Sequence, residues 1–411
     1  MAKVLVIGSG AREHAIAAQM LKSPQVDEVY CAPGNPGMKK SGIDIEDIDE
    51  LDFAGLTAFA KKNQVDLTFV GPEVPLAKGI VDYFEDQGLK IFGPNQSSAR
   101  LESNKEFAKK FMKRHDIPTA KYQAFTNVDE ALDYAKKLNF PIVVKENGLA
   151  GGKGVTIVKD EKDLKPTIQT SLKKAGEILL EEFLQGEEYS VMVFVGGQQR
   201  VIFPISQDHK KLYEGEVGPN TGGMGAYSPV PHITPTIVKD TVDQIVDPTI
   251  KGLKTDDLEF YGIIYVGCML TSDGPKVIEY NLRLGDPETQ VLLPQMESNF
   301  YQVTMDLVNR KQPDIKFQEK DFYFGVVVAA PGYPKNPKQH IALPDLPENV
   351  YIAGVTEENG KLYSKGGRIF TLFDHASTLK EAKTKVYAEL AKLGLSEFYY
   401  RKDIGFKDIN N

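Results

Sequence analysis

The first hundred residues alternate between short apolar runs and amphipathic stretches. Four runs are apolar enough to be buried strands, and Leu76–Gln87 has the apolar spacing of a helix. The predicted strands are Lys3–Ile7, Val26–Cys31, Val65–Val70 and Leu89–Phe92. Strand–helix alternation predicts a parallel sheet. A turn rich in glycine or proline follows each strand (GSGAREHA, APGNPG, GPEVPL and GPN), and these turns would meet at the edge where open sheets bind ligands.

From about residue 97 the pattern becomes that of a mixed region. A polar helix is predicted over Ser97–Asp116, with Ser103 and Glu106 at the spacing of a capping box. A helix over Val128–Leu138, the strand PIVVKEN, a lysine-rich helix and the strand EILLEEFL then follow. This order of elements predicts a small α+β lobe over residues 119–190.

The rest of the chain predicts a larger lobe and a closing domain. Strands are expected over Glu188–Ser206, a long helix over Thr234–Leu253, and two adjacent strands over Tyr261–Arg283 that turn at an Asp-Gly pair. The apolar run FGVVVAAPGYP then restarts the pattern, and the last helix is predicted near Thr378–Leu393. We therefore predict three domains, spanning residues 1–102, 103–320 and 321–411.

The composition is that of an ordinary globular protein, with 41% hydrophobic and 26% charged residues. A formal net charge of −8 provides no global positive field to hold nucleic acid or an anionic membrane. Cys31 and Cys268 have no metal-motif spacing, so we expect two buried thiols. The chain begins without a basic or long apolar leader, and no run approaches the ~20 apolar residues that span a bilayer, which predicts a cytoplasmic protein.

A glycine-rich loop follows the predicted strand that ends at Lys145. The loop GLAGGKG spans Gly148–Gly154 and carries a second lysine, Lys153. Backbone N–H groups of such a loop can surround phosphate oxygens, and the lysines supply neutralising charge. A flexible hairpin with solvated lysines is the alternative. The loop is not a P-loop, because Gly154 occupies the place of the magnesium-binding Ser or Thr, and a lysine before the loop does not fit a protein kinase.

The segment KVIEYNLRLGDPETQ combines oxygen ligands with a cation. On a strand, Glu279 and Asn281 share one face, and Arg283 follows if the strand continues. A carboxylate and an amide oxygen suit Mg²⁺, which keeps waters and nucleotide phosphates as its other ligands. Arg283 can then clamp phosphoryl oxygens. Glu188 could hold a ribose, and for each of these residues a purely structural or solvated role is the alternative.

Taken together, these motifs resemble the ATP-grasp superfamily, through the glycine loop after Lys145, the EEFL segment, the Glu279–Asn281 pair and RLGDPETQ. Within it, GSGAREHA, APGNPG, SQDHK, GPNTGGMGAYSP and RLGDPETQ resemble the phosphoribosylamine–glycine ligases of purine biosynthesis. The resemblance runs from Val4 into the last domain. It implies α/β and α+β structure: an N-terminal Rossmann-like parallel-sheet domain, a central ATP-grasp domain of two lobes, and a small C-terminal mixed α/β domain.

The resemblance also implies a reaction and its residues. ATP, 5-phospho-β-D-ribosylamine and glycine would give ADP, phosphate and glycinamide ribonucleotide through glycyl phosphate. Arg283, Lys145 and Asp286 would be catalytic, and Glu279 and Asn281 would hold Mg²⁺ or Mn²⁺. The expected ATP-binding residues are Lys105, Lys145, Gly151, Gly152, Lys153, Gly154, Glu181, Glu182, Phe183 and Leu184, with Glu188 on the ribose. The expected residues for phosphoribosylamine and glycine are Gly8, Ser9, Gly10, Arg12, Asn35, Pro36, Gly37, Glu73, Asp208, Lys210, Asn220, Gly222, Gly223, Met224 and Gly225.

The chain departs from the family pattern in two places. The family usually has glycine where this chain has Ala11, and a positive φ at Ala11 would mean strain. The strand YGIIYVGCML lacks the acidic residue that many relatives carry there, so Glu279 would bridge two ions or fewer ions would bind. We expect His14 and His209 to be hydrogen-bonding scaffold residues.

Other functions fit the sequence less well. Gly8 and Gly10 suggest a nicotinamide-dependent dehydrogenase, but Glu13 occupies the position of the third glycine in that motif. A silent nucleotide-binding regulator would not need the lysine, the metal pair and the arginine together. A neighbouring purine carboxylase or formyl-phosphate-using enzyme would share the ATP machinery without these acceptor loops. We expect a monomer that binds small molecules, with a dimer as the alternative.

Overall fold

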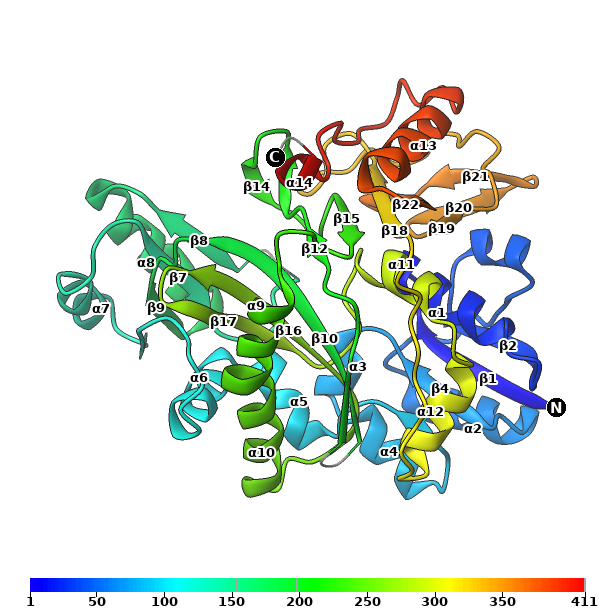
Figure 1. Cartoon of the computed structure of the whole chain (residues 1–411), viewed down its shortest axis with the longest axis horizontal. Helices are drawn as coiled ribbons and strands as arrows, with labels where there is room; N and C mark the ends of the chain where they lie inside the picture. The colour runs from blue at the N-terminus through cyan, green and yellow to red at the C-terminus, as the bar shows by residue number, and fades with distance from the viewer. Residues whose placement is uncertain (152–153, 197–198, 410–411) are drawn as a thin grey trace.

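The computed structural model describes residues 1–151, 154–196 and 199–409. Its N-terminal part is a five-stranded, fully parallel sheet in the order β3-β2-β1-β4-β5. Figure 1 shows this sheet in blue on one side of the molecule. The predicted parallel sheet is therefore confirmed. Its elements are β1 (Ala2–Gly8), α1 (Ala11–Leu21), β2 (Val26–Pro33), β3 (Asp44–Ile45), α2 (Phe53–Asn63), β4 (Leu67–Val70) and β5 (Ile91–Phe92).

Alternation along β1 decides what each face of the sheet contacts. Leu5 and Ile7 pack with Leu56 of α2, whereas Val4 and Val6 share a core with Phe300 from the central region. Successive side chains of a strand point to opposite faces. The N-terminal sheet is thus fastened to the rest of the protein through one face.

The helix predicted over Leu76–Gln87 is wrong in detail, because the chain forms two helices there. These are α3 (Glu73–Ala77) and α4 (Ile80–Asp86), and Gly79 between them has φ 83°. A left-handed residue interrupts an α-helix, and glycine adopts that conformation without strain.

The helix predicted over Ser97–Asp116 is also divided, into α5 (Gln96–Ser103) and α6 (Lys105–Arg114). Asn104 between them is extended, and its side chain accepts a hydrogen bond from the Phe107 amide. The predicted capping box is therefore wrong: Ser103 ends one helix, and Asn104 caps the next.

The small lobe is an antiparallel sheet in the order β6-β9-β7-β8 with two helices packed on it. It extends to one side of the molecule in Figure 1. Its elements are β6 (Tyr122–Phe125), α7 (Val128–Ala135), β7 (Ile142–Glu146), β8 (Val155–Val158), α8 (Glu161–Ala175) and β9 (Ile178–Glu182).

The larger lobe contains the long strands that run through the middle of Figure 1. The sheet order is β11-β10-β16-β17, formed by β10 (Glu187–Gly196), β11 (Gln199–Ile202), β16 (Tyr261–Thr271) and β17 (Gly274–Asn281). The helix predicted over Thr234–Leu253 is confirmed as one continuous helical segment, formed by α9 (Pro235–Thr241), a π-helical turn (Val242–Val246) and α10 (Asp247–Thr255). Pro248 has no amide hydrogen for the regular hydrogen-bond ladder, which accounts for the irregular turn.

The last sheet joins the C-terminal segment to the central region. Its order is β12-β15-β18-β22-β19, so β12 and β15 from the central segment extend it, and α13 covers it. Figure 1 shows these elements together above the N-terminal domain. The strands are β12 (Gln207–Asp208), β15 (Gly225–Ser228), β18 (Phe322–Ala329), β19 (Val350–Ile352) and β22 (Arg368–Ala376), and the helix is α13 (Leu379–Lys392).

Shorter elements complete the fold. They are β13 (Lys211–Tyr213), β14 (Val217–Asn220), α11 (Thr289–Leu292), α12 (Phe300–Val308), β20 (Val355–Glu358), β21 (Lys361–Ser364) and α14 (Phe406–Ile409). Cys31 and Cys268 are both buried free thiols. Within the described ranges, no helix has the length and apolar character needed to cross a bilayer.

Candidate active site

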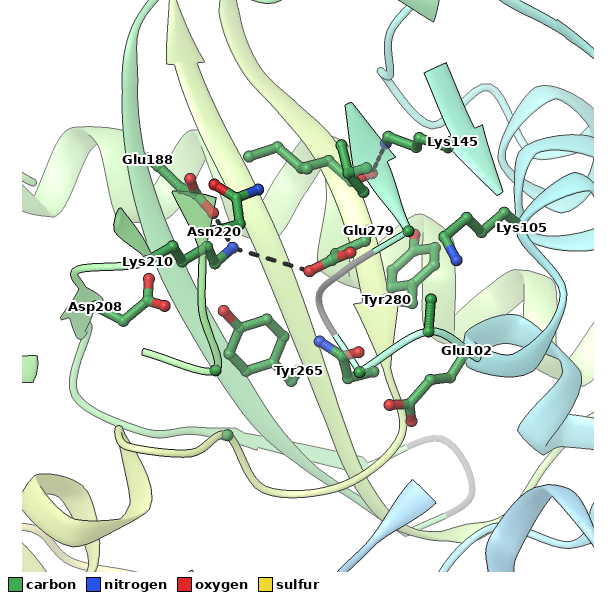
Figure 2. A pocket seen from close by; sticks show the side chains of 18 of the residues that line it. Glu102, Lys105, Lys145, Glu188, Asp208, Lys210, Asn220, Tyr265, Glu279 and Tyr280 are labelled. Atoms are coloured by element: carbon green, nitrogen blue, oxygen red, sulfur yellow. Dashed lines mark hydrogen bonds and ion pairs between the residues drawn. The ribbon is translucent and has the colours of Figure 1, made fainter. Parts of the chain in front are cut away.

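A cavity of about 530 Å³ lies where the two lobes, the N-terminal domain and the C-terminal sheet meet. Figure 2 shows side chains from several of these parts directed into it. Nineteen of the residues that the sequence predicted for the site line this cavity. They are Arg12, Glu73, Lys105, Lys145, Gly151, Gly154, Glu181, Glu182, Phe183, Leu184, Glu188, Asp208, Lys210, Asn220, Gly222, Glu279, Asn281, Arg283 and Asp286.

Other predicted residues lie behind the cavity wall. Within the described part of the chain, those outside the lining are Gly8, Ser9, Gly10, Asn35, Pro36, Gly37, Gly223, Met224 and Gly225. Gly152 and Lys153 lie outside the described residues.

Two lysines share one buried carboxylate at the small-lobe side. The Glu181 Oε2 atom is 3.0 Å from Lys145 Nζ and 2.9 Å from Lys109 Nζ. Lys145 also donates to the Ile278 carbonyl, which connects the small lobe to β17. Burial lowers the pKa of Lys109 to about 8, although Glu181 opposes this shift. The Glu181 side chain therefore holds two lysines at the wall of the cavity.

Lys105 is held at the start of the glycine loop. Its Nζ donates to the Gly148 carbonyl over 2.6 Å, and its backbone amide donates to the Asn147 side chain. Burial lowers the pKa of the Lys105 ammonium. Lys105 and Lys145 thus provide two positive charges next to the loop.

Lys210 lies between two carboxylates at the centre of the cavity. Its ammonium forms an ion pair with Glu188 and is 3.8 Å from the Glu279 Oε1 atom (Figure 2). Burial alone would raise the pKa of Glu279, but Lys210, Lys145 and Lys105 outweigh it and lower the pKa. Glu279 is therefore ionised and available to a cation.

Sheet register places Glu279 opposite Gly267 and Asn281 opposite Tyr265. Gly267 belongs to β16, whose residues Tyr261–Thr271 include no Asp or Glu. Within the described ranges, no three His, Cys, Asp or Glu residues form a cluster that could hold a metal ion alone. A cation here would need ligands from a bound nucleotide as well.

A second acidic pair lies next to Lys210. Burial raises the pKa of Asp208 well above its usual value although Lys210 opposes this, and burial also raises the pKa of Glu288. Glu288 is 2% exposed and accepts a hydrogen bond from Ser190 over 3.2 Å. The Tyr265 hydroxyl is hydrogen-bonded to the same serine. This pair places two buried carboxyl groups with raised pKa values beside Lys210.

Arg283 joins the central lobe to the N-terminal domain. Its Nε is 3.2 Å from Glu73 Oε2, its Nη2 is 3.1 Å from Glu102 Oε1, and its Nη1 donates to the Leu284 carbonyl. Burial raises the pKa of Glu102 to about 7. Burial acts on Glu73 in the same sense, but Arg283 and Arg12 reverse it and lower that pKa to about 2. With three contacts to described residues, two of the five guanidinium N–H groups are left for a ligand.

The first glycine turn surrounds a glutamate. Glu13 Oε2 accepts the Gly10 amide over 2.7 Å, and Glu13 Oε1 is 2.6 Å from Arg12 Nε. A Cβ at Gly8 would lie 2.6 Å from Glu13 Cγ, and a Cβ at Gly71 would also overlap Glu13. The absent side chains thus make room for Glu13, whose carboxylate fixes the guanidinium of cavity-lining Arg12.

The turn Asn35–Gly37 packs on the C-terminal sheet. Asn35 Nδ2 donates to the carbonyls of Ser9 and Ile352, and Asn35 Oδ1 accepts the Gly37 amide. A Cβ at Gly37 would lie 2.5 Å from Ile352 Cγ2. These contacts explain the asparagine and the glycine as packing residues that join the two domains.

Three residues that drew attention in the sequence have local structural explanations. Ala11 is the first residue of α1 and does not have a positive φ, so it is not strained. His14 accepts the Ile352 amide, and His209 accepts the Gly405 amide. Burial lowers their pKa values to about 4 and about 3, respectively. Both histidines are therefore neutral acceptors, as expected of scaffold residues.

Comparison with known proteins decides the family. The phosphoribosylglycinamide synthetase N domain matches residues 2–102, the ATP-grasp (A) domain 103–289 and the C domain 323–407. The chain belongs to the phosphoribosylglycinamide synthetase family. A phosphoribosylamine–glycine ligase from Listeria innocua is 46% identical, covering 98% of this chain and 99% of that relative. One from Lactococcus lactis is 45% identical, covering 99% of this chain and 100% of that relative.

Solved structures agree with this membership. The crystal structure of the Thermotoga maritima phosphoribosylamine–glycine ligase matches with a TM-score of 0.84 and 33% identity, covering 98% of this chain and 99% of that one. A Campylobacter jejuni biotin carboxylase matches with a TM-score of 0.73 at 17% identity, over 97% of this chain and 91% of that one, and shows the shared fold alone. The predicted family, fold class and ATP-dependent ligase activity are confirmed.

Several charged cavity residues were not among those predicted from the sequence, including Glu102, Lys109, Glu288 and Arg368. Glu102 and Lys109 lie on helices that read as polar surface, and Arg368 begins a strand in another domain. Glu288 lies within the RLGDPETQ motif, two residues after Asp286, so for this residue the motif was a usable signal. Their partners are distant in sequence, and only the fold brings them together.

Proposed function

We propose that this chain joins glycine to 5-phospho-β-D-ribosylamine through glycyl phosphate. The observation that carries the proposal is one cavity lined both by the lysines beside the glycine loop and by Arg12 and Glu73 of the N-terminal domain. A ligase needs the γ-phosphate, the acid and the amine within one site, because the activated acid must meet the amine before water does.

ATP would lie on the small-lobe side of this cavity. Residues 181–184 would contact the adenine, Glu188 the ribose, and Lys105 and Lys145 the phosphates. The Gly148–Gly154 loop would cover the phosphates and exclude water. The ion pair between Glu188 and Lys210 would open when the ribose hydroxyls bind.

The residues present fit a divalent cation. Glu279 is ionised and, like Asn281, lines the cavity, and both offer the hard oxygen atoms that Mg²⁺ or Mn²⁺ prefers. When bound, such an ion would neutralise phosphate charge. The remaining ligands would come from ATP and water, which agrees with the absence of a three-residue cluster among the described residues.

The chemistry then takes two steps. A glycine carboxylate oxygen attacks the γ-phosphorus, the bond to the β-phosphate oxygen breaks, and ADP leaves. The two remaining N–H groups of Arg283 would stabilise the transferring phosphoryl oxygens. The phosphoribosylamine nitrogen next attacks the glycyl carbonyl carbon, phosphate leaves with the former carboxylate oxygen, and the nitrogen loses one proton.

The acceptor would occupy the side of the cavity formed by Arg12, Glu73, Asp208, Lys210 and Asn220. Arg12 offers charge to the 5-phosphate, because Glu13 fixes its guanidinium from behind. Gly8, Gly10, Asn35 and Gly37 would support this pocket from the second layer, as their contacts with Glu13 and Ile352 indicate. A carboxylate such as Asp208 is suited to take the proton that the nitrogen loses.

Omission experiments test the proposal. Purified protein with Mg²⁺, ATP, glycine and freshly generated phosphoribosylamine is expected to release phosphate and form glycinamide ribonucleotide in equal amounts. Omitting glycine or phosphoribosylamine is expected to abolish formation of the ribonucleotide. Phosphate release that continues at the full rate without glycine would overturn the assignment of the substrate.

A further inference from the structure

Arg368 is a cavity residue from the C-terminal sheet, and it contacts two separate loops. Its Nη2 is 2.6 Å from Asp286 Oδ2, and its Nη1 donates to the Asp286 carbonyl over 3.1 Å. The same Nη1 donates to the Gly222 carbonyl over 2.5 Å. One planar guanidinium thereby joins the RLGDPETQ loop to the GPNTGGMG loop.

The Gly222 peptide is held from both ends. The Gly222 amide donates a hydrogen bond to the Tyr333 hydroxyl over 2.8 Å, and the Gly222 carbonyl accepts one from Arg368. A Cβ at Gly222 would lie 3.0 Å from Arg368 Cζ. Gly223 has φ 104°, and a Cβ there would overlap Pro287. The two glycines therefore let the loop fit between the C-terminal domain and the Asp286–Pro287 turn.

The same loop sets the position of Lys210. The amide and hydroxyl of Thr221 both donate to the Lys210 carbonyl, over 2.8 and 2.9 Å. Lys210 in turn pairs with Glu188 and approaches Glu279. A contiguous path of hydrogen bonds thus leads from Arg368 and Tyr333 through Gly222 and Thr221 to the centre of the cavity.

Asp286 has no free carboxylate oxygen in this arrangement. One oxygen accepts Arg368, and the other accepts Gln290 Nε2 over 2.7 Å. Such a carboxylate anchors a loop better than it transfers a proton, because both of its acceptor sides are used.

We propose that Arg368, assisted by Tyr333, is a positioning residue of the C-terminal domain that sets the glycine and phosphoribosylamine site without contributing to the ATP site. The inference rests on the proposed function. Asp286 and Gly222 lie on the acceptor side, and Arg368 contacts none of Lys105, Lys145 or residues 181–184 in the described structure. Lys210, at the end of the path, lies between the acceptor side and Glu188. Losing the bidentate contacts of Arg368 should therefore displace the acceptor side of the cavity more than the ATP side.

Steady-state kinetics of Arg368→Lys test this. Lysine keeps the charge but cannot bridge Asp286 and Gly222 with a planar fork. Because a hydrogen bond to a charged group contributes about 1.5–3 kcal/mol, KM for glycine and for phosphoribosylamine should rise about 10- to 100-fold. KM for ATP should change less than about twofold. Tyr333→Phe, which removes only the acceptor for the Gly222 amide, should show the same selectivity with a smaller increase.

Arg200→Lys is the matched control, because Arg200 pairs with Asp247 outside the cavity. It should leave all three KM values unchanged. Equal increases in the three KM values of Arg368→Lys, or a lower melting temperature with unchanged KM values, would reduce Arg368 to a general structural residue. Wild-type protein that makes no glycinamide ribonucleotide would instead overturn the proposed function.

Discussion

Replacing Arg283 with lysine is expected to lower kcat about 10²- to 10³-fold, the loss typical of removing one donor to a charged transition state. Lysine keeps a positive charge near Glu73 and Glu102, so these buried carboxylates remain compensated. The substitution removes the planar guanidinium, which contacts both carboxylates and still offers N–H groups to the phosphoryl oxygens. Measuring kcat and KM by coupled ADP release, together with the melting temperature, separates the two effects.

The alanine variant and a surface control complete this experiment. Arg283→Ala should also lose stability, by about 3–5 kcal/mol, because it leaves paired buried charges without their partner. Arg114→Lys, at an exposed pair with Asp256, should alter neither kcat nor stability. If Arg283→Lys retained the wild-type kcat, Arg283 would be only a domain-joining residue.

Replacing Lys145 with methionine is expected to reduce kcat/KM for ATP about 10²- to 10³-fold without unfolding the protein. Glu181 would still be paired with Lys109, so no uncompensated carboxylate remains in the interior. Lys145 is the penultimate residue of β7, the strand that leads into the glycine loop, and also contacts Ile278. Lys109 is instead held by Thr119. The positive charge that Lys145→Met removes therefore lies on the side of the cavity proposed for the ATP phosphates.

Lys109→Met is the matched control for this substitution. It removes the other lysine from the same carboxylate, and Glu181 then keeps Lys145. Its loss in kcat/KM should be at least about tenfold smaller than that of Lys145→Met. Calorimetric titration should likewise show weaker ATP binding by Lys145→Met than by Lys109→Met. Equal losses in the two variants would mean that the lysines act as one structural unit.

The larger elements of this fold could be predicted from apolar periodicity, since β1, β7, β17 and α13 have clear patterns. The errors occurred where one residue interrupts a helix. Gly79 and Asn104 each act through a local property, namely a left-handed backbone and a capping side chain. A single such residue within a helical pattern is often tolerated, so the sequence alone does not show that the helix ends there.

The site was predictable where motif residues themselves reach the cavity, as with Lys145, Glu279 and Arg283. The site was not predictable where a motif glycine makes room for a neighbouring side chain instead of lining the cavity. Gly8 makes room for Glu13, and Gly37 makes room for Ile352, so their role depends on what packs against them. The placement of Arg368 needed the tertiary structure, because its loop partners lie 82 and 146 residues away.

Transfer of oxygen from glycine to phosphate tests the central claim most directly. Protein turning over glycine labelled with ¹⁸O in both carboxylate oxygens should release phosphate that contains one ¹⁸O atom per molecule, and ADP should contain none. This follows because the carboxylate oxygen that attacks the γ-phosphorus leaves with phosphate when the amine attacks. Unlabelled phosphate, or label in a nucleotide product, would contradict activation through glycyl phosphate.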